Sequence, residues 1–376
     1  MKINYPLSCL LMMLLITSCK DNYAPALVNS DKNILVVEGV LDAAGSQTQV
    51  RLSRSTGIDN FNNIIAEDGA QITVEGESGT PQPLYASGGG FYRGFLSLNT
   101  SSRYRVRIRT LDGKEYLSAY TDVKITPPID SIGWTRNAEG IIIHANTHDD
   151  SGNTTYYRWE YEETWEIHSF YFSNLIYINN AVRARSFPSE DRSVCWKHAN
   201  STNILTASSA KLGSDRISAA PLLFIPNGSE RLTWRYSILV RQYALEKNAY
   251  EFYDLMKKNT ESIGTIFDPQ PSEVRGNFTC ISDPEEPVIG HVTAGTVQTQ
   301  RIFINSSQVP HWVFPESCPV QNVTPDSIRY YFEGDGYMPY SVKETENGGI
   351  EYYLSSYGIC VDCTKRGGTV QRPAFW

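Results

Sequence analysis

Residues 156–167, YYRWEYEETWEI, alternate strictly in character, and this alternation constrains the fold more than any other feature of the chain. Successive side chains of a β-strand point to opposite faces of a sheet, so a period of two predicts a half-buried strand. We interpret the aromatic row as the core face of a sheet rather than as an exposed platform for a ligand. One face carries Tyr157, Trp159, Tyr161, Glu163, Trp165 and Ile167.

Glu163 is the exception within this row. A carboxylate on a buried aromatic face must find a hydrogen-bond donor or shift its pKa. We therefore expect Glu163 either to end the buried stretch or to pair with an arginine.

The first residues, MKINYPLSCLLMMLLITSCKDN, have the form of a secretory signal. A lysine precedes a short apolar run, and small residues come before Cys19, which resembles the bacterial lipobox. We predict a signal peptide over residues 1–18, lipidation of Cys19 and a polar tether over 19–31. The alternative is an ordinary secreted protein. No later stretch approaches the roughly 18 apolar residues that cross a bilayer.

The charge balance disfavours nucleic acid as a partner. The chain has 33 Lys and Arg against 41 Asp and Glu, a formal net charge of -8. No run of five basic residues offsets this excess of acids. Its 376 residues suggest two or three domains, each large enough for a core.

Five cysteines remain beyond the predicted lipidation site: Cys195, Cys280, Cys318, Cys360 and Cys363. In an oxidising compartment we expect structural disulfides and, because the number is odd, one free thiol. The motif CVDC at 360–363 also permits a redox pair or part of a zinc site. However, the following TKRGGTVQRP cannot continue a helix, and further zinc ligands at close spacing are missing.

The fold class that we predict is mainly β, with tandem antiparallel sandwich modules of the immunoglobulin or fibronectin type. Short strands punctuated by Gly, Asn and Asp predict an N-terminal β-sandwich over 32–126. The row of arginines at 103–109 is expected on its solvated face. A fibronectin-like domain follows over 127–262, with one substantial helix at 245–259. A C-terminal β region with the CVDC motif occupies 263–376.

Residues 168–230 have no clean period and are rich in Asn, Ser and Arg. Long insertions of this kind in compact domains are usually functional or mobile. We therefore predict an irregular insertion here and take it as the first candidate for a binding surface. The final Trp376 is expected to pack into the body.

The sequence offers no catalytic motif. No G-x-S-x-G, H-E-x-x-H or P-loop pattern occurs. His144 and His148 lie four residues apart on an expected strand, which would separate their imidazoles by roughly 13 Å. We therefore predict no enzyme activity, no metal and no cofactor.

Several segments together resemble a family of Bacteroidota lipoproteins, domain of unknown function 4249. They are GTIFDPQPSEVRGN, VIGHVTAG, RIFI, CVDCTKRGGTVQRPAFW, YYRWEYEETW and RYSILVRQY. The resemblance implies an outer-membrane lipoprotein, often associated with TonB-dependent receptors of the SusC type, and no established enzymatic activity.

Our leading hypothesis is a non-catalytic, lipid-anchored binding or accessory subunit of a TonB-dependent nutrient transporter at the outer membrane. A structural or adhesive envelope protein is the main alternative. A glycan or peptide hydrolase with its site in residues 168–230 is a third, which would require a pocket with two carboxylates about 5 to 10 Å apart.

Overall fold

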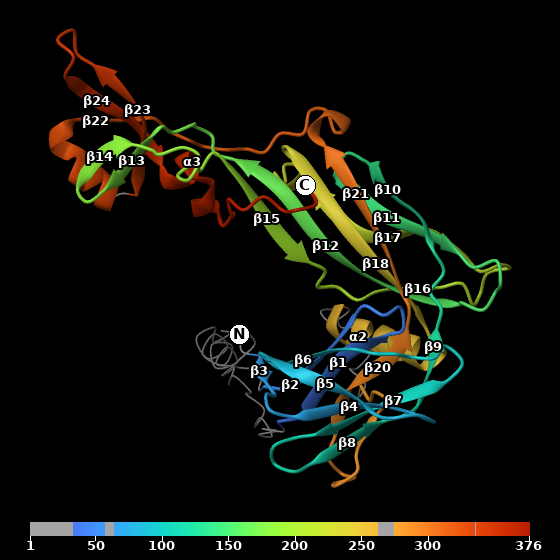
Figure 1. Ribbon diagram of the computed structural model, residues 1–376. Coiled ribbons are helices and arrows are strands. Elements are labelled where there is room, and N and C mark those ends of the chain that lie inside the picture. The colour runs from blue at the N-terminus through green and yellow to red at the C-terminus, as the bar shows by residue number, and fades with distance from the viewer. Residues whose placement is uncertain (1–32, 57–63, 262–273, 335) are drawn as a thin grey trace, which may run out of the picture.

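The computed structural model describes residues 33–56, 64–261, 274–334 and 336–376. The predicted signal peptide, Cys19 and the tether lie outside these residues. Strands dominate the described chain, so it is mainly β as predicted. Figure 1 shows three bodies along an arc: a closed N-terminal sheet, two central sheets and a small distal module.

Eight strands form the closed sheet, in the order β7-β4-β5-β6-β2-β1-β20-β9, and β9 pairs again with β7. They are β1 (Leu35–Asp42), β2 (Gln47–Arg54), β4 (Gln71–Gly76), β5 (Gln82–Gly88), β6 (Phe91–Phe95), β7 (Arg103–Arg109), β9 (Thr121–Lys124) and β20 (Val288–Gly295). Strands β3 (Ile65–Ala66), β8 (Glu115–Ser118) and β19 (Phe278–Cys280) extend it. The sequence predicted an antiparallel β-sandwich here, of two separate sheets. The sheet closes instead because β9 and β20 connect β7 to β1.

The strand that completes the closed sheet comes from far along the chain. β20 runs parallel to β1, with Leu35 opposite Val288. Parallel neighbours need a crossover connection rather than a hairpin. Gly290 has φ +146°, and a Cβ there would lie 2.2 Å from the carbonyl oxygen of Val37. Glycine therefore permits the close approach of β20 to β1.

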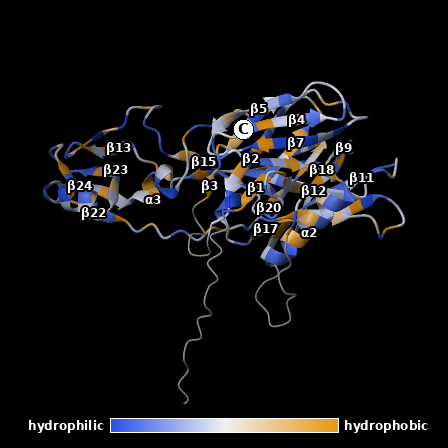
Figure 2. Ribbon diagram, turned by 90° about the horizontal axis from the view of Figure 1, so that it is seen from below, coloured by the Kyte–Doolittle hydropathy of each residue, from blue (hydrophilic) through white to orange (hydrophobic). Residues whose placement is uncertain are grey.

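Alternation along the strands separates the core of the closed sheet from its outer surface. Hydrophobic and hydrophilic residues alternate along these strands in Figure 2. On β7, Val106 and Ile108 are fully buried. The neighbouring Arg105 and Arg107 lie on the outer face, as predicted, and both bind Glu75 of β4.

Two central sheets share one hydrophobic core. The first contains β10 (Ile129–Arg136), β11 (Gly140–His148) and β17 (Arg216–Pro226). The second contains β15 (Val194–Asn200), β12 (Tyr156–His168), β18 (Arg235–Leu245) and β21 (Val297–Asn305), with β16 (Leu205–Ser208) beside β12. Both sheets contribute buried side chains, among them Ile141, Ile143, Trp159, Tyr236 and Ile238. The fibronectin-like topology of this region stays a prediction.

The aromatic row of β12 faces this core, which confirms the prediction from its alternation. Every member of the row is at most 9% exposed. Glu163 accepts a hydrogen bond of 2.7 Å from the hydroxyl of Tyr236, and Arg231 lies 3.5 Å away. Burial raises the pKa of the Glu163 carboxyl, against the opposing effects of Tyr236 and Arg231. The expected arginine partner is therefore Arg231.

The helix α2 (Lys247–Glu261) lies at the junction between the closed sheet and the central sheets. It agrees closely with the predicted helix at 245–259. Ala249 is fully buried, and the ring of Phe252 lies 5.5 Å from that of His291 on β20. The guanidinium of Arg158 on β12 lies 4.6 Å from the ring of Tyr253. The helix thus contacts both bodies.

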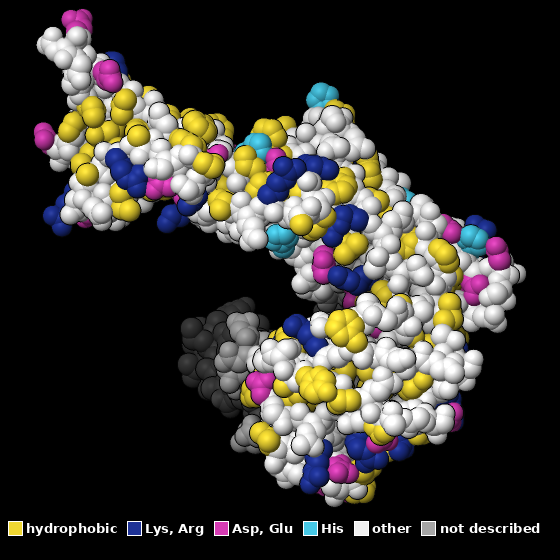
Figure 3. All heavy atoms as spheres, in the orientation of Figure 1, with side chains coloured by type: hydrophobic (Ala, Val, Ile, Leu, Met, Phe, Trp, Pro, Cys, Tyr) yellow, Lys and Arg dark blue, Asp and Glu magenta, His cyan; other side chains and the backbone are white. Residues whose placement is uncertain are grey.

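The distal module forms one end of the arc and combines two distant parts of the chain. A hairpin of β13 (Leu175–Ile178) and β14 (Ala181–Ala184) contacts a sheet of β22 (Gln321–Val323), β24 (Ile350–Tyr357) and β23 (Tyr337–Glu344). The short helices are η4 (Pro325–Ser327), η5 (Tyr330–Gly334) and α3 (Gly358–Val361). Figure 3 shows a wide hollow between this module and the closed sheet.

The sheets cross the predicted domain boundaries. Strands β19 and β20 were expected in the C-terminal region. Instead, β20 completes the closed sheet, β19 extends it, and β21 joins the central sheets. The region 168–230 is not irregular, because β15, β16 and β17 also belong to the central sheets. Register shifts where β17 pairs with β11 break the period of two, which hides this strand in the sequence. No helix among the described residues is long and apolar enough to cross a membrane.

Candidate functional site

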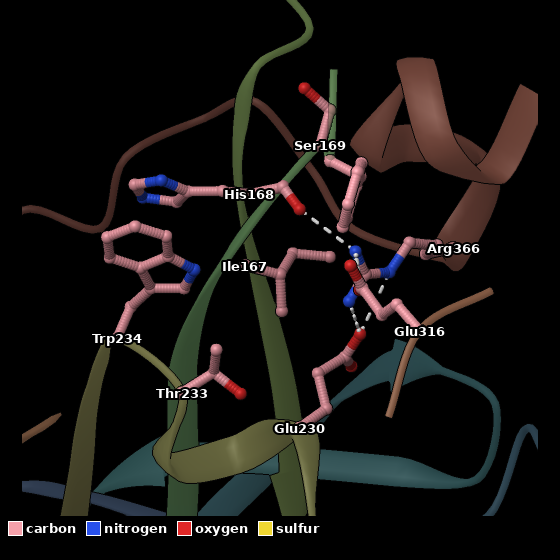
Figure 4. A pocket seen from close by; sticks show the side chains of 9 residues that line it. Ile167, His168, Ser169, Glu230, Thr233, Trp234, Glu316 and Arg366 are labelled. Carbon is pink, nitrogen blue, oxygen red and sulfur yellow. Dashed lines mark hydrogen bonds and ion pairs between the residues drawn. The ribbon is translucent and has the colours of Figure 1, made fainter. Parts of the chain in front are cut away.

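A small pocket lies where the central five-stranded sheet meets the C-terminal segment (Figure 4). Its volume is about 180 Å³. It is lined by Ile167, His168, Ser169, Phe170, Glu230, Thr233, Trp234, Glu316 and Arg366. Some of these residues come from the end of β12, from η2 (Glu230–Leu232) and from the residues just before β18. Glu316 lies in the segment that enters the distal module, and Arg366 lies in the segment that follows it. The pocket therefore includes both ends of the region that we predicted as a binding surface.

A disulfide fixes the C-terminal wall of this pocket. It joins Cys195 of β15 to Cys363, the first residue of η6 (Cys363–Arg366). Gly367 ends this helical turn with φ +82°, a left-handed conformation that favours glycine at a helix C-terminus. A Cβ on Gly368 would lie only 2.6 Å from the Cβ of Cys195. The disulfide and these glycines together place Arg366 against the end of β12.

Arg366 connects three segments of the chain. Its Nε donates to Oε1 of Glu230 at 2.9 Å, and its Nη1 lies 2.7 Å from Oε1 of Glu316. The same Nη1 donates to the backbone oxygen of His168 at 2.9 Å. The side chain is only 13% exposed, so these contacts are shielded from water.

Glu230 is held as a carboxylate by two cations. Lys197 of β15 donates to its Oε2 at 2.7 Å, and the indole of Trp165 donates to the same oxygen at 3.3 Å. Burial alone would raise the pKa of Glu230, but the hydrogen bonds from Lys197 and Arg366 outweigh it and lower the pKa. Glu230 is therefore ionised at neutral pH.

The opposite wall is an aromatic pair. The ring of His168 stacks on that of Trp234, with centroids 3.7 Å apart. The His168 Nε2 lies 2.7 Å from Glu166 Oε1, and Glu166 Oε2 accepts a hydrogen bond of 2.9 Å from the Trp376 indole. The C-terminal residue thus packs against the body, as expected, and supports this wall from behind.

The arrangement suits binding better than acid–base chemistry. Both pocket carboxylates, Glu230 and Glu316, are bound to one guanidinium, that of Arg366. A general acid must hold a proton near its working pH, whereas the pKa of Glu230 is lowered. What remains in the pocket is an aromatic face, an apolar floor and a few polar atoms.

The predicted cysteines form two disulfides, Cys195–Cys363 and Cys318–Cys360. Cys280 is buried and forms no disulfide with any other described cysteine, in line with the odd number. The two cysteines of the CVDC motif bond to different partners, so they do not form a redox pair with each other. Cys19 lies outside the described residues.

Other candidates are placed apart from the pocket. His148 of β11 lies 2.7 Å from Asp130, and no group of three or more potential metal ligands gathers within residues 33–56, 64–261, 274–334 and 336–376.

Sequence reasoning missed the residues that build the pocket. Arg366, Glu316 and Glu230 come from three separate segments, and of these three residues only Arg366 lies in a motif that was singled out in the sequence, CVDCTKRGGTVQRPAFW. The only available signal was the position of Arg366 three residues after Cys363, which becomes informative once the partner of that cysteine is known.

The sequence profile of domain of unknown function 4249 matches residues 20–301. The chain belongs to this family. No curated protein matches the DUF4249 chain significantly.

Two solved structures show distant similarity to this DUF4249 protein. One from Bacteroides uniformis, provisionally described as a carbohydrate-binding protein, is 13% identical and covers 57% of this chain and 91% of its own, with a TM-score of 0.16. One from Corynebacterium diphtheriae, provisionally described as membrane-anchored, is 12% identical and covers 57% and 55%, with a TM-score of 0.15. Neither similarity is close enough to bear on function.

Proposed function

We propose that this DUF4249 protein is a non-catalytic lipoprotein of the cell envelope. In this proposal, lipid on Cys19 holds the folded body at the outer membrane, where it serves as a binding or accessory subunit of a TonB-dependent transporter. The lipobox-like sequence before Cys19 and the family membership support the anchor and the compartment.

The two disulfides are the observation that carries the envelope location. They use four of the five cysteines that follow Cys19, and each joins residues that are far apart in the sequence. Disulfides persist in oxidising compartments and are rare in the cytosol. This usage supports a location beyond the inner membrane.

The pocket supports a binding role. Its two carboxylates are bound to Arg366. The lining also presents an aromatic wall and the Oγ1 of Thr233, a buried atom that has no hydrogen-bond partner among the described residues. Binding sites in general combine apolar lining with a few fixed polar groups. Figure 3 shows a further concave surface in the hollow between the closed sheet and the distal module.

The anchor is tested by labelling cells with radioactive palmitate. We expect label on the wild-type protein and none on a Cys19→Ser variant, with the wild type in the outer-membrane fraction. An unlabelled protein that fractionates with the cytosol would refute the proposal.

The partner is tested by mild cross-linking of intact cells and pull-down from detergent-solubilised outer membranes. We expect a TonB-dependent receptor, identified by mass spectrometry, to be recovered with the wild type and lost with Cys19→Ser. Recovery of the protein alone would favour the structural or adhesive alternative.

A further inference from the structure

We propose that the pocket of Figure 4 binds one neutral ring that carries several hydroxyl groups, such as a terminal pyranose unit of a glycan. This inference rests on the proposed binding role and adds the chemical class of the ligand. It is carried by the hydrogen-bonding character of three polar atoms in the lining, by the cancellation of the pocket's charges and by its size.

Three polar atoms of the pocket differ in hydrogen-bonding character. Thr233 Oγ1 is buried and has no partner among the described residues, so a ligand group there would satisfy it. The indole nitrogen of Trp234, turned toward Ile167 in Figure 4, can only donate. Glu316 is bound to Arg366 through Oε1, which leaves Oε2 as an acceptor. A hydroxyl group both donates and accepts, so a ligand with several hydroxyls matches all three atoms.

The charges of the wall cancel within the protein. The carboxylates of Glu230 and Glu316 are paired with the cations of Arg366 and Lys197. A charged ligand would have to compete with these short ion pairs and would leave one partner unsatisfied, which is costly at a shielded site. A neutral ligand meets no such cost.

The lining also offers apolar and aromatic side chains to a ring. Ile167 forms the floor, while Phe170 and Trp234 are 54% and 45% exposed. The C–H face of a pyranose can cover such surfaces while its hydroxyls reach the polar atoms. The volume of about 180 Å³ is smaller than the roughly 300–1,000 Å³ of sites for drug-sized ligands. The exposed edge leaves room for the rest of a glycan outside.

The test is isothermal titration calorimetry on the purified full chain in detergent, with the methyl glycosides of glucose, galactose, mannose and N-acetylglucosamine. We expect at least one to bind. Thr233→Val, which replaces the hydroxyl by a methyl, should weaken that binding about tenfold, since a lost hydrogen bond of about 1.4 kcal/mol corresponds to a factor of ten. Thr233→Ser should restore it. Trp234→Phe should weaken it severalfold, and Trp234→Ala more.

Phe95→Ala, at an aromatic residue of β6 that is 72% exposed and outside the pocket, is the matched control and should bind as the wild type does. Methyl glucuronide, which carries a carboxylate, should bind more weakly than its neutral counterpart. The inference is overturned if no pyranoside binds, if Thr233→Val binds as tightly as the wild type, or if the glucuronide binds best. Because this assay needs neither anchor nor transporter, a negative result beside positive palmitate labelling rejects the ligand class and leaves the proposed location intact.

Discussion

The closed sheet and the distal module hold distant segments of the chain together by different interactions. Each joins segments that lie far apart in the chain, such as β1 and β20 in the first and β13 and β23 in the second. The closed sheet does so by hydrogen bonds around a large core that includes Leu35, Val50 and Val292, all fully buried. Its described part contains no disulfide, and Cys280 there is unpaired.

The distal module has a much smaller apolar interior. Val323 and Tyr353 are buried in its sheet, but several large apolar side chains around them are exposed, including Ile350 and Ile359. It is closed by Cys318–Cys360, and Cys195–Cys363 ties its base to the central sheets. Small modules bury too little apolar surface to offset chain entropy and are commonly stabilised by disulfides. The comparison indicates that the body with the large hydrophobic core is stable without disulfides, whereas the module with the small core depends on them.

Of the substitutions considered, removal of the disulfide Cys318–Cys360 should lower stability most. For Cys318→Ser with Cys360→Ser, the separation of 42 residues corresponds to about 4 kcal/mol in the chain-entropy model. Hydrogen exchange read by mass spectrometry should show faster exchange in β22, β23 and β24, with β1 and β20 unchanged. Cys280→Ala, at the unpaired thiol of the closed sheet, is the control. Unchanged protection of the distal strands would refute the conclusion that this module depends on its disulfide.

A substitution at Gly290 should damage the closed sheet instead. Gly290→Ala places a Cβ against the backbone of Val37 at a φ that favours glycine, and we expect a loss of about 3 kcal/mol from strain and displaced pairing. Exchange should rise in β1 and β20 and not in the distal strands. Gly213→Ala, where a Cβ would meet nothing within 4 Å, is the matched control. Equal behaviour of the two variants would contradict closure by β20.

The ion pairs of Glu230 should help the disulfide Cys195–Cys363 to hold the C-terminal segment against the central sheets. Glu230→Gln should cost about 2 kcal/mol at pH 7, because hydrogen bonds to charged groups are lost. The pKa of Glu230 is lowered from its usual 4.5, so its contribution is present above pH 4.5 and is lost as pH falls through the folded-state pKa. Urea unfolding at several pH values should therefore show the two proteins converging below pH 4.5. A constant difference would refute this assignment.

Glu163 of β12 provides the opposite case. Burial raises its pKa above the usual 4.5, so its contribution is full below pH 4.5 and is lost as pH rises toward the folded-state pKa. Glu163→Gln, which does not titrate, should gain stability relative to the wild type as pH rises above 4.5. The same urea series measures this, and a variant that loses stability with rising pH would show that Arg231 outweighs burial.

Substitution of the C-terminal Trp376 should change the free energy of unfolding least. Trp376→Ala removes the hydrogen bond to Glu166 and the contact of the indole with the guanidinium of Arg235, 5.2 Å from its ring. We expect a loss of about 1 kcal/mol, the scale of one exposed cation–π contact and one hydrogen bond. Trp376→Phe should recover part of it. No change in urea unfolding would mean that the tail is not part of the support for His168.

Local patterns in the sequence determined the strands with strict alternation and the one long helix. The aromatic row of β12, the arginine row of β7 and α2 follow from the spacing of apolar residues alone, since that spacing fixes which face is buried. The sequence also required Glu163 to find a donor. It did not identify Arg231, because the partner lies outside the local pattern.

Only the tertiary structure decided the closure of the first sheet, the pairing of the cysteines and the pocket. Parallel pairing of β1 with β20 leaves no turn signal, since the two strands are not joined by a hairpin. Five cysteines permit many pairings, and nothing in their spacing selects Cys195–Cys363. Arg366, Glu230 and Glu316 meet only in the folded chain, because their attraction acts over a few ångströms in space and not along the sequence.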